Sequence, residues 1–155
     1  MKKKFVALLM AVACMVTGIF AMNVESKAET LVEEDVDLSY LMTEDAIIGY
    51  MERQTWGVYL SSGYSSINDA GAGKVGAGGI TNAAVRCKVS VNAVVERKVG
   101  GSWLRVTSWS QTNENALTAS VSKYLYVTTG YYYRVRSTHS AGSDASTSST
   151  NGLWM

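Results

Sequence analysis

The clearest hydrophobic pattern in the chain is a strict alternation that runs from Gly130 to Ala141. One face of this segment is aromatic and β-branched, whereas the other face includes two arginines. The two sets are Tyr131, Tyr133 and Val135 on the first face, and Tyr132, Arg134 and Arg136 on the second. A period of two is typical of a β-strand that buries one side. The pattern therefore predicts a strand with an aromatic core face and a basic outer face.

Similar alternating segments recur along the chain, separated by residues that favour turns. The longest is Val85–Val99, and the Gly100-Gly101 pair after it favours a tight hairpin turn into the next segment. We also expect turns over residues 61–71 and 113–115, which are rich in Ser, Asn, Asp and Gly. The predicted strands cover residues 56–61, 74–81, 85–99, 103–111, 117–127, 130–141 and 146–154.

Seven short strands joined by turns predict an all-β fold, and consecutive hairpins make the strand pairing antiparallel. We therefore expect a single antiparallel β-sandwich of the immunoglobulin or fibronectin type III kind. In those folds a tyrosine near the start of the sixth strand hydrogen-bonds to the upstream backbone. Tyr131 and Tyr133 are the candidates for that bond here.

The first residues have the pattern of a secretory signal peptide. Three lysines precede an apolar run from Phe5 to Met22, and Ser26-Lys27-Ala28 supplies small residues at the cleavage site. We expect cleavage after Ala28, so that residues 1–28 are removed. The chain then contacts the membrane only through the signal peptide, before cleavage. The alternative is a retained anchor, because the run approaches the length of about 20 residues that spans a bilayer. The expected location is secreted and extracellular, in association with the cell surface.

Charge divides the remaining chain in two. Residues 29–52 carry only acidic charges, whereas basic residues outnumber acidic ones in residues 53–155. We expect an acidic, flexible leader at 29–52 and a mildly basic β-sandwich domain at 53–155. A short helix from Thr43 through Met51 is a further hypothesis, because early acids suit a helix start. A second interpretation of the leader is a pro-segment that shields the basic domain.

Catalytic chemistry has few candidates in this sequence. Cys87 and His139 are the only Cys–His pair after residue 28, and an apolar strand face would raise the pKa of the Cys87 thiol. A Cys–His hydrolase is therefore a remote alternative. One Cys and one His are too few for a zinc site, so we expect no metal, no cofactor and no enzymatic activity. The acids after residue 53 are all expected at turns or strand ends: Asp69, Glu96, Glu114 and Asp144.

Five segments of the chain carry a family resemblance. They are Gly57–Leu60, Lys74–Gly79, Tyr131–Arg136, Thr138–Ala141 and Thr150–Leu153. Together they resemble a family of small exported proteins of Gram-positive bacteria, catalogued only as a domain of unknown function. The resemblance covers nearly the whole span from residue 56 to residue 155. It implies export and a single β domain, and it points to no activity, ligand or catalytic residue.

Aromatic residues are too numerous to share one buried face of a small sheet. The set comprises Trp56, Tyr59, Tyr64, Trp103, Trp109, Tyr124, Tyr126, Tyr132 and Trp154. Exposed aromatic patches usually mark recognition surfaces, although rings also serve cores and cross-strand pairs. We assign ligand binding to Tyr132, Arg134, Arg136, Trp103 and Trp109.

The expected ligand is a cell-wall (envelope) or host glycan, because sugars stack their apolar ring faces on aromatic side chains. The alternative function is a structural or protein-interaction surface protein that oligomerises through its polar last strand. We do not expect nucleic acid as a partner, because the chain is expected to be exported.

Overall fold

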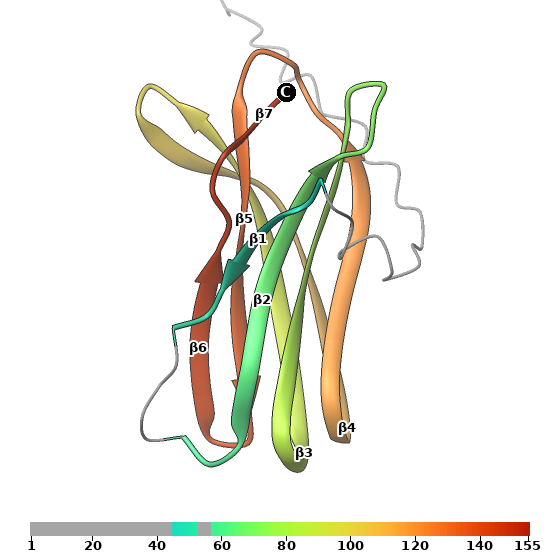
Figure 1. Cartoon of the computed structure of the whole chain (residues 1–155), viewed down its shortest axis with the longest axis vertical. Helices are drawn as coiled ribbons and strands as arrows, with labels where there is room; N and C mark the ends of the chain where they lie inside the picture. Colours follow the sequence, from blue (N-terminus) through green and yellow to red (C-terminus); the bar gives the residue numbers. More distant parts are fainter. Residues whose placement is uncertain (1–44, 53–56) are drawn as a thin grey trace, which may run out of the picture.

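The structure is a computed structural model that describes residues 45–52 and 57–155 (Figure 1). All regular structure within these residues is β, and they contain no helix that is long and apolar enough to cross a membrane. The predicted signal peptide, most of the acidic leader and Trp56 lie outside the described residues. The strands are β1 (Ile47–Tyr50), β2 (Leu60–Asp69), β3 (Lys74–Val99), β4 (Ser102–Tyr126), β5 (Tyr132–Ala141), β6 (Asp144–Ser149) and β7 (Leu153–Trp154).

The strands form one antiparallel sheet that is nearly closed into a barrel (Figure 1). The order is β1-β2-β3-β5-β6, with β4 paired to β3 and β7 paired to β5. The first half of β3 pairs with β2 and its second half pairs with β5, while β4 accompanies β3 along its length. The all-β, antiparallel prediction is confirmed. A two-sheet sandwich of the immunoglobulin type is not confirmed, because β3 and β4 run continuously through both halves.

The two long strands reverse direction midway, at the lower end of the molecule in Figure 1. Pairing of β3 with β4 is interrupted between Asn82 and Cys87, and Asn115 on β4 has a positive φ of 48°. Asparagine tolerates this left-handed conformation better than most residues. The turn predicted at residues 113–115 is therefore a bend within β4. The predicted strands 74–81 and 85–99 are the two halves of β3, and the predicted strands 103–111 and 117–127 are the two halves of β4.

The turn predicted over residues 61–71 is wrong for most of its length, because Leu60–Asp69 is strand β2. Its small residues are there for close packing, since a Cβ on Gly63 would lie 2.6 Å from Cγ of His139 on β5. The actual turn follows the strand, where Asp69 Oδ1 accepts a hydrogen bond of 2.8 Å from the Gly71 amide. Both Gly71 and Gly73 have positive φ, which glycine adopts without strain.

The helix predicted through Met51 is also wrong, because residues 47–50 form β1, which pairs with residues 64–67 of β2. Ile47 and Ile48 are β-branched and favour a strand over a helix. A Cβ on Gly49 would lie 2.0 Å from the Ser149 carbonyl oxygen on β6. Glycine at this position therefore lets β1 approach β6, and the sheet begins before the predicted domain boundary at residue 53.

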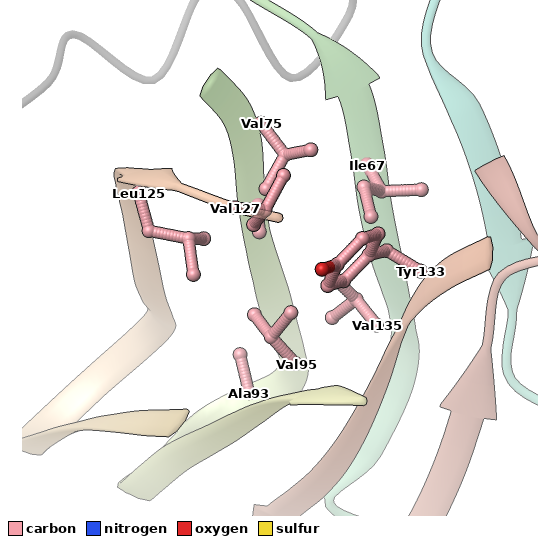
Figure 2. Close-up of a cluster of buried hydrophobic side chains, with 9 residues drawn as sticks. Ile67, Val75, Ala93, Val95, Leu125, Val127, Tyr133 and Val135 are labelled. Atoms are coloured by element: carbon pink, nitrogen blue, oxygen red, sulfur yellow. The ribbon is translucent and has the colours of Figure 1, made fainter. Parts of the chain in front are cut away.

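The larger hydrophobic cluster fills the end of the sheet beneath β7. Figure 2 shows Tyr133 and Val135 of β5 pointing into it from the face that the alternation predicted. The Tyr133 hydroxyl donates a hydrogen bond of 2.8 Å to the Thr128 carbonyl, five residues upstream, as predicted. The buried members are Ile67, Val75, Ala77, Ala93, Val95, Leu125, Val127, Tyr133 and Val135.

A second, smaller cluster lies towards the bends and comprises Val89, Val91, Ala119 and Ala141. A buried polar layer separates the two clusters along β2, β3 and β5. On β5, for example, the inward residues are Tyr133 and Val135, then Ser137 and His139, then Ala141. Hydrogen-bonded side chains therefore divide the hydrophobic core on this side, while Val121 of β4 packs against both clusters.

His139 is the centre of the polar layer and is fully buried. Its Nδ1 lies 2.8 Å from Thr81 Oγ1, and its Nε2 lies 2.7 Å from Ser148 Oγ. Thr81 Oγ1 donates its own proton to the Ser90 carbonyl at 2.9 Å. Nδ1 must then be the protonated nitrogen, and Nε2 accepts from Ser148.

Two serines extend the layer across the interior. Ser65 Oγ on β2 lies 2.8 Å from Ser137 Oγ and 2.7 Å from Ser148 Oγ. Gly79 makes room for this contact, because a Cβ there would lie 2.5 Å from Ser137 Oγ. The hydroxyl groups thus connect β2, β5 and β6 through the core, and an unsatisfied member would be costly.

Asp144 fixes the segment that precedes β2. Its Oδ2 accepts hydrogen bonds from the Leu60 amide at 3.0 Å and the Tyr59 amide at 2.6 Å. These two bonds lower the pKa of the Asp144 carboxyl below its usual value. The carboxylate therefore contributes stability above its ordinary pKa near 4, and this contribution is lost as the pH falls further.

Replacing Tyr133 by Phe is expected to lower the free energy of unfolding by about 1 kcal/mol, because the hydrogen bond to Thr128 is lost. Replacing it by Ala should cost roughly 3–5 kcal/mol, because the buried ring leaves a cavity. Urea denaturation of both variants measures these losses. Equal stability of wild type and the Phe variant would show that the hydroxyl makes no net contribution.

Acid should destabilise the protein through His139, whose pKa is lowered to about 4 by burial. The unfolded chain binds this proton near pH 6.5, so unfolding takes up a proton between pH 6.5 and 4. Stability should be fully present above pH 7 and should fall by on the order of 3 kcal/mol across that window. The contribution of Asp144 to stability changes only below this pH window, because the pKa of its carboxyl is lowered.

The measurement is urea denaturation at several pH values, together with an NMR titration of the imidazole. His139 is the only histidine in the chain, so its signal is unambiguous. An imidazole that titrates near pH 6.5 in the folded protein would contradict the prediction.

Candidate functional site

Four of the five predicted ligand-binding residues lie on the outer side of β4 and β5. Tyr132 and Arg136 are exposed, whereas Trp103 and Arg134 are half-buried against their neighbours. Strand β3 lies between them, because Lys98 pairs with Trp103 and Glu96 pairs with Arg134. The structure thus brings these four side chains onto one continuous surface.

Trp109 does not belong to this surface, although its even spacing from Trp103 predicted the same face. Val95 pairs with Thr107 and Glu96 pairs with Arg105, which leaves Val106 as an extra residue in β4. Such a bulge shifts the alternation by one position and sends later side chains to the opposite face. Trp109 therefore packs inward against the larger hydrophobic cluster.

Trp154 joins the surface in its place. Tyr132 pairs with Trp154 on β7, and their rings meet edge to face with centroids 4.9 Å apart. A Cβ on Gly152 would lie 3.3 Å from atoms of both Trp103 and Tyr132, so these rings converge on the glycine. We call Trp103, Tyr132 and Trp154 the aromatic patch. The sequence contained Trp154 in its surplus of aromatic residues, but nothing in the alternation placed it beside Tyr132.

Cationic side chains accompany the patch. The Arg134 guanidinium lies over the Trp103 ring, with 4.4 Å between Cζ and the ring centroid. Lys98 Nζ lies 5.9 Å from the same centroid. Cations over an indole face are attracted by its negative quadrupole, so both contacts stabilise the orientation of Trp103.

A buried carboxylate holds the two arginines. Glu96 is 5% exposed, and its Oε2 lies 2.7 Å from Arg134 Nε while its Oε1 lies 3.0 Å from Arg136 Nη2. The sequence predicted Glu96 at a turn or strand end, but it lies where β3 pairs with both β4 and β5. The sequence carried no signal that this acid would be covered by two arginines.

Cys87 and His139 do not form a bonded pair. Both nitrogens of His139 bond hydroxyl groups inside the polar layer, and Cys87 is a half-buried free thiol at the bend of β3. Among the residues that the structure describes, no three Cys, His, Asp or Glu side chains are grouped closely enough to hold a metal ion. The contacts on the outer face are ring contacts, cation–π contacts and charged hydrogen bonds.

Replacing either Arg134 or Arg136 by Ala should lower the free energy of unfolding by roughly 1 kcal/mol, because Glu96 still pairs with the other arginine. The double variant Arg134→Ala/Arg136→Ala should cost clearly more than the sum, because a buried carboxylate then has no cation. A double-mutant cycle by urea denaturation measures the coupling. Strict additivity would show that the two arginines do not share Glu96 in solution. Arg86→Ala, an exposed arginine near the bend of β3, is the matched control.

Comparison with curated proteins and comparison with solved structures gave no match. A family model described as a family of unknown function matches residues 26–153, which include the acidic segment as well as the sheet. The match covers most of the chain and includes the five segments on which the resemblance was based. The chain therefore belongs to this family of unknown function, DUF6147.

Proposed function

We propose that the protein is a secreted, non-catalytic binding protein that holds cell-envelope or host glycans through the aromatic patch. The observation that carries the proposal is the convergence of Trp103, Tyr132 and Trp154 from three strands onto one outer face. Tyr132 is 46% exposed and Trp154 is 58% exposed. Large exposed aromatic groups on a small domain favour a recognition surface, and pyranose rings stack on such groups.

The neighbouring charges suit a sugar ligand. Arg134 is held between Glu96 and the Trp103 ring, so it loses little rotamer freedom when a ligand binds. A guanidinium offers planar N–H donors that match the hydroxyl and carboxylate oxygens of a glycan. Rigid rings and a prepositioned donor lower the entropic cost of binding.

Export fits the same proposal. We infer that residues 1–28 act as a signal peptide in a Gram-positive bacterium, and that the mature domain reaches the cell surface or the medium. The hydrogen bond from Tyr133 to Thr128 supports a distant relation to immunoglobulin-type sandwiches, which often present binding surfaces.

The alternative is an oligomerising structural protein, and one observation favours it. In the described part of the chain, β4 pairs only with β3, so residues 107–113 of β4 have no strand partner on their other side. Residues 107–113 of this edge carry no charge, and unpaired uncharged edges favour pairing with another strand. The edge involved is that of β4, whereas the sequence had suggested the last strand.

Two measurements on the secreted protein distinguish these functions: its binding to a glycan array and its mass in solution. We expect glycan binding by a monomer, and roughly tenfold or greater loss of affinity for Trp154→Ala, as for an aromatic contact at the centre of an interface. Tyr126→Ala is the matched control, because Tyr126 is 43% exposed and lies on the other half of β4. No glycan bound, together with a defined oligomer, would overturn the proposal in favour of the alternative.

A further inference from the structure

A groove of about 740 Å³ lies over β6, beside β5, which contributes Tyr132 to the aromatic patch. Its floor is residues 145–149, which are Ala, Ser or Thr and therefore short. Tyr50 and Glu52 line it on the β1 side, and Arg136 and Thr138 line it on the β5 side. The groove exists because a strand of small side chains runs between neighbours with longer ones.

The lining is suited to a ligand rich in hydroxyl groups. Thr138, Thr147 and Ser149 are exposed and paired across β5 and β6, and each hydroxyl both donates and accepts. Glu52 adds an acceptor, and the Tyr50 ring, 72% exposed, adds an aromatic face. A protein interface would need an apolar centre, and no aliphatic residue larger than alanine lines this groove.

Arg136 connects the groove with the aromatic patch. It lines the groove, and its Nε and Nη2 bond Glu96, which also holds Arg134 over Trp103. A guanidinium has five N–H donors, so Nη1 of Arg136 keeps its donors for a ligand. One buried carboxylate therefore orients a cation at each of the two places.

The two places also lie along one line. Tyr132, Arg134, Arg136 and Thr138 occupy alternate positions on the outer face of β5. This stretch of strand is roughly 20 Å long at about 3.3 Å per residue. A monosaccharide or disaccharide on the patch is too short to reach Thr138 and Thr147 in the groove, whereas a longer linear chain can contact both places.

We propose that the groove over β6 is a second subsite for the same ligand, and that the ligand is a linear polysaccharide longer than a disaccharide. This inference rests on the proposed glycan-binding function. The patch binds one part of the sugar chain by stacking, and the groove binds a later part by hydrogen bonds. Linking two subsites through one ligand raises its affinity without any new contact at either.

The test uses β-1,4-linked N-acetylglucosamine oligomers, from the disaccharide to the hexasaccharide, titrated into ¹⁵N-labelled protein and followed by NMR. The disaccharide should shift the indole N–H signals of Trp103 and Trp154 only. The hexasaccharide should also shift the amides of Thr138 and Thr147, and should bind about tenfold or more tightly.

Thr147→Trp fills the groove without touching the patch. It should remove the affinity gain of the hexasaccharide and leave disaccharide binding unchanged, which also shows that the variant is folded. Thr112→Trp is the matched control, because Thr112 is an exposed threonine on β4 outside the groove.

The outcomes separate the two proposals. Shifts at the indoles with every oligomer, without shifts at Thr138 and Thr147 and without a gain in affinity, overturn the second subsite and leave the patch. Absence of indole shifts with all oligomers overturns the patch, and the second subsite with it.

Discussion

The hydrogen bonds around His139 are the constraint on which the rest of the sheet depends. A barrel interior normally closes by packing apolar side chains, yet here Thr81, Ser148 and the imidazole meet between two apolar clusters. Each hydroxyl has to find a partner on another strand, so the relative positions of β3, β5 and β6 are restricted. Gly63 fits the same arrangement, since the imidazole lies where its side chain would be.

The outer face is fixed by this interior. Strand β5 alternates, so placing Tyr133, Val135 and His139 inward necessarily places Tyr132 and Arg134 outward. The inward-facing residues of β5 therefore determine which side chains of β5 reach the aromatic patch and the groove over β6. Glu96 adds a second level of order, because a buried carboxylate between two arginines restricts the motion of both.

The sequence predicted what depends on alternation alone. The faces of β5 and the hairpin at Gly100-Gly101 follow from local pattern and are confirmed. The tyrosine hydrogen bond was expected by analogy with immunoglobulin-type folds, and Tyr133 makes it. Prediction failed where packing overrode composition, as in β2, whose serines and glycines resemble a turn but serve close contact. It also failed at Trp109, where one inserted residue reversed the face, because a bulge leaves no mark in the alternation of β4 itself.

The division of the core by polar side chains has a consequence for how related chains can diverge. On the side of β2, β5 and β6, packing changes in one apolar cluster reach the other through hydroxyl and imidazole contacts, which tolerate little displacement, whereas Val121 of β4 packs against both clusters. The cluster beneath the aromatic patch and the cluster near the bends are therefore separated on the side of the polar layer and joined on the side of β4. Tyr133 and Val135, which lie on the polar-layer side, can change size together, and with them the shape of the surface above, while the opposite end of β5 keeps its own packing.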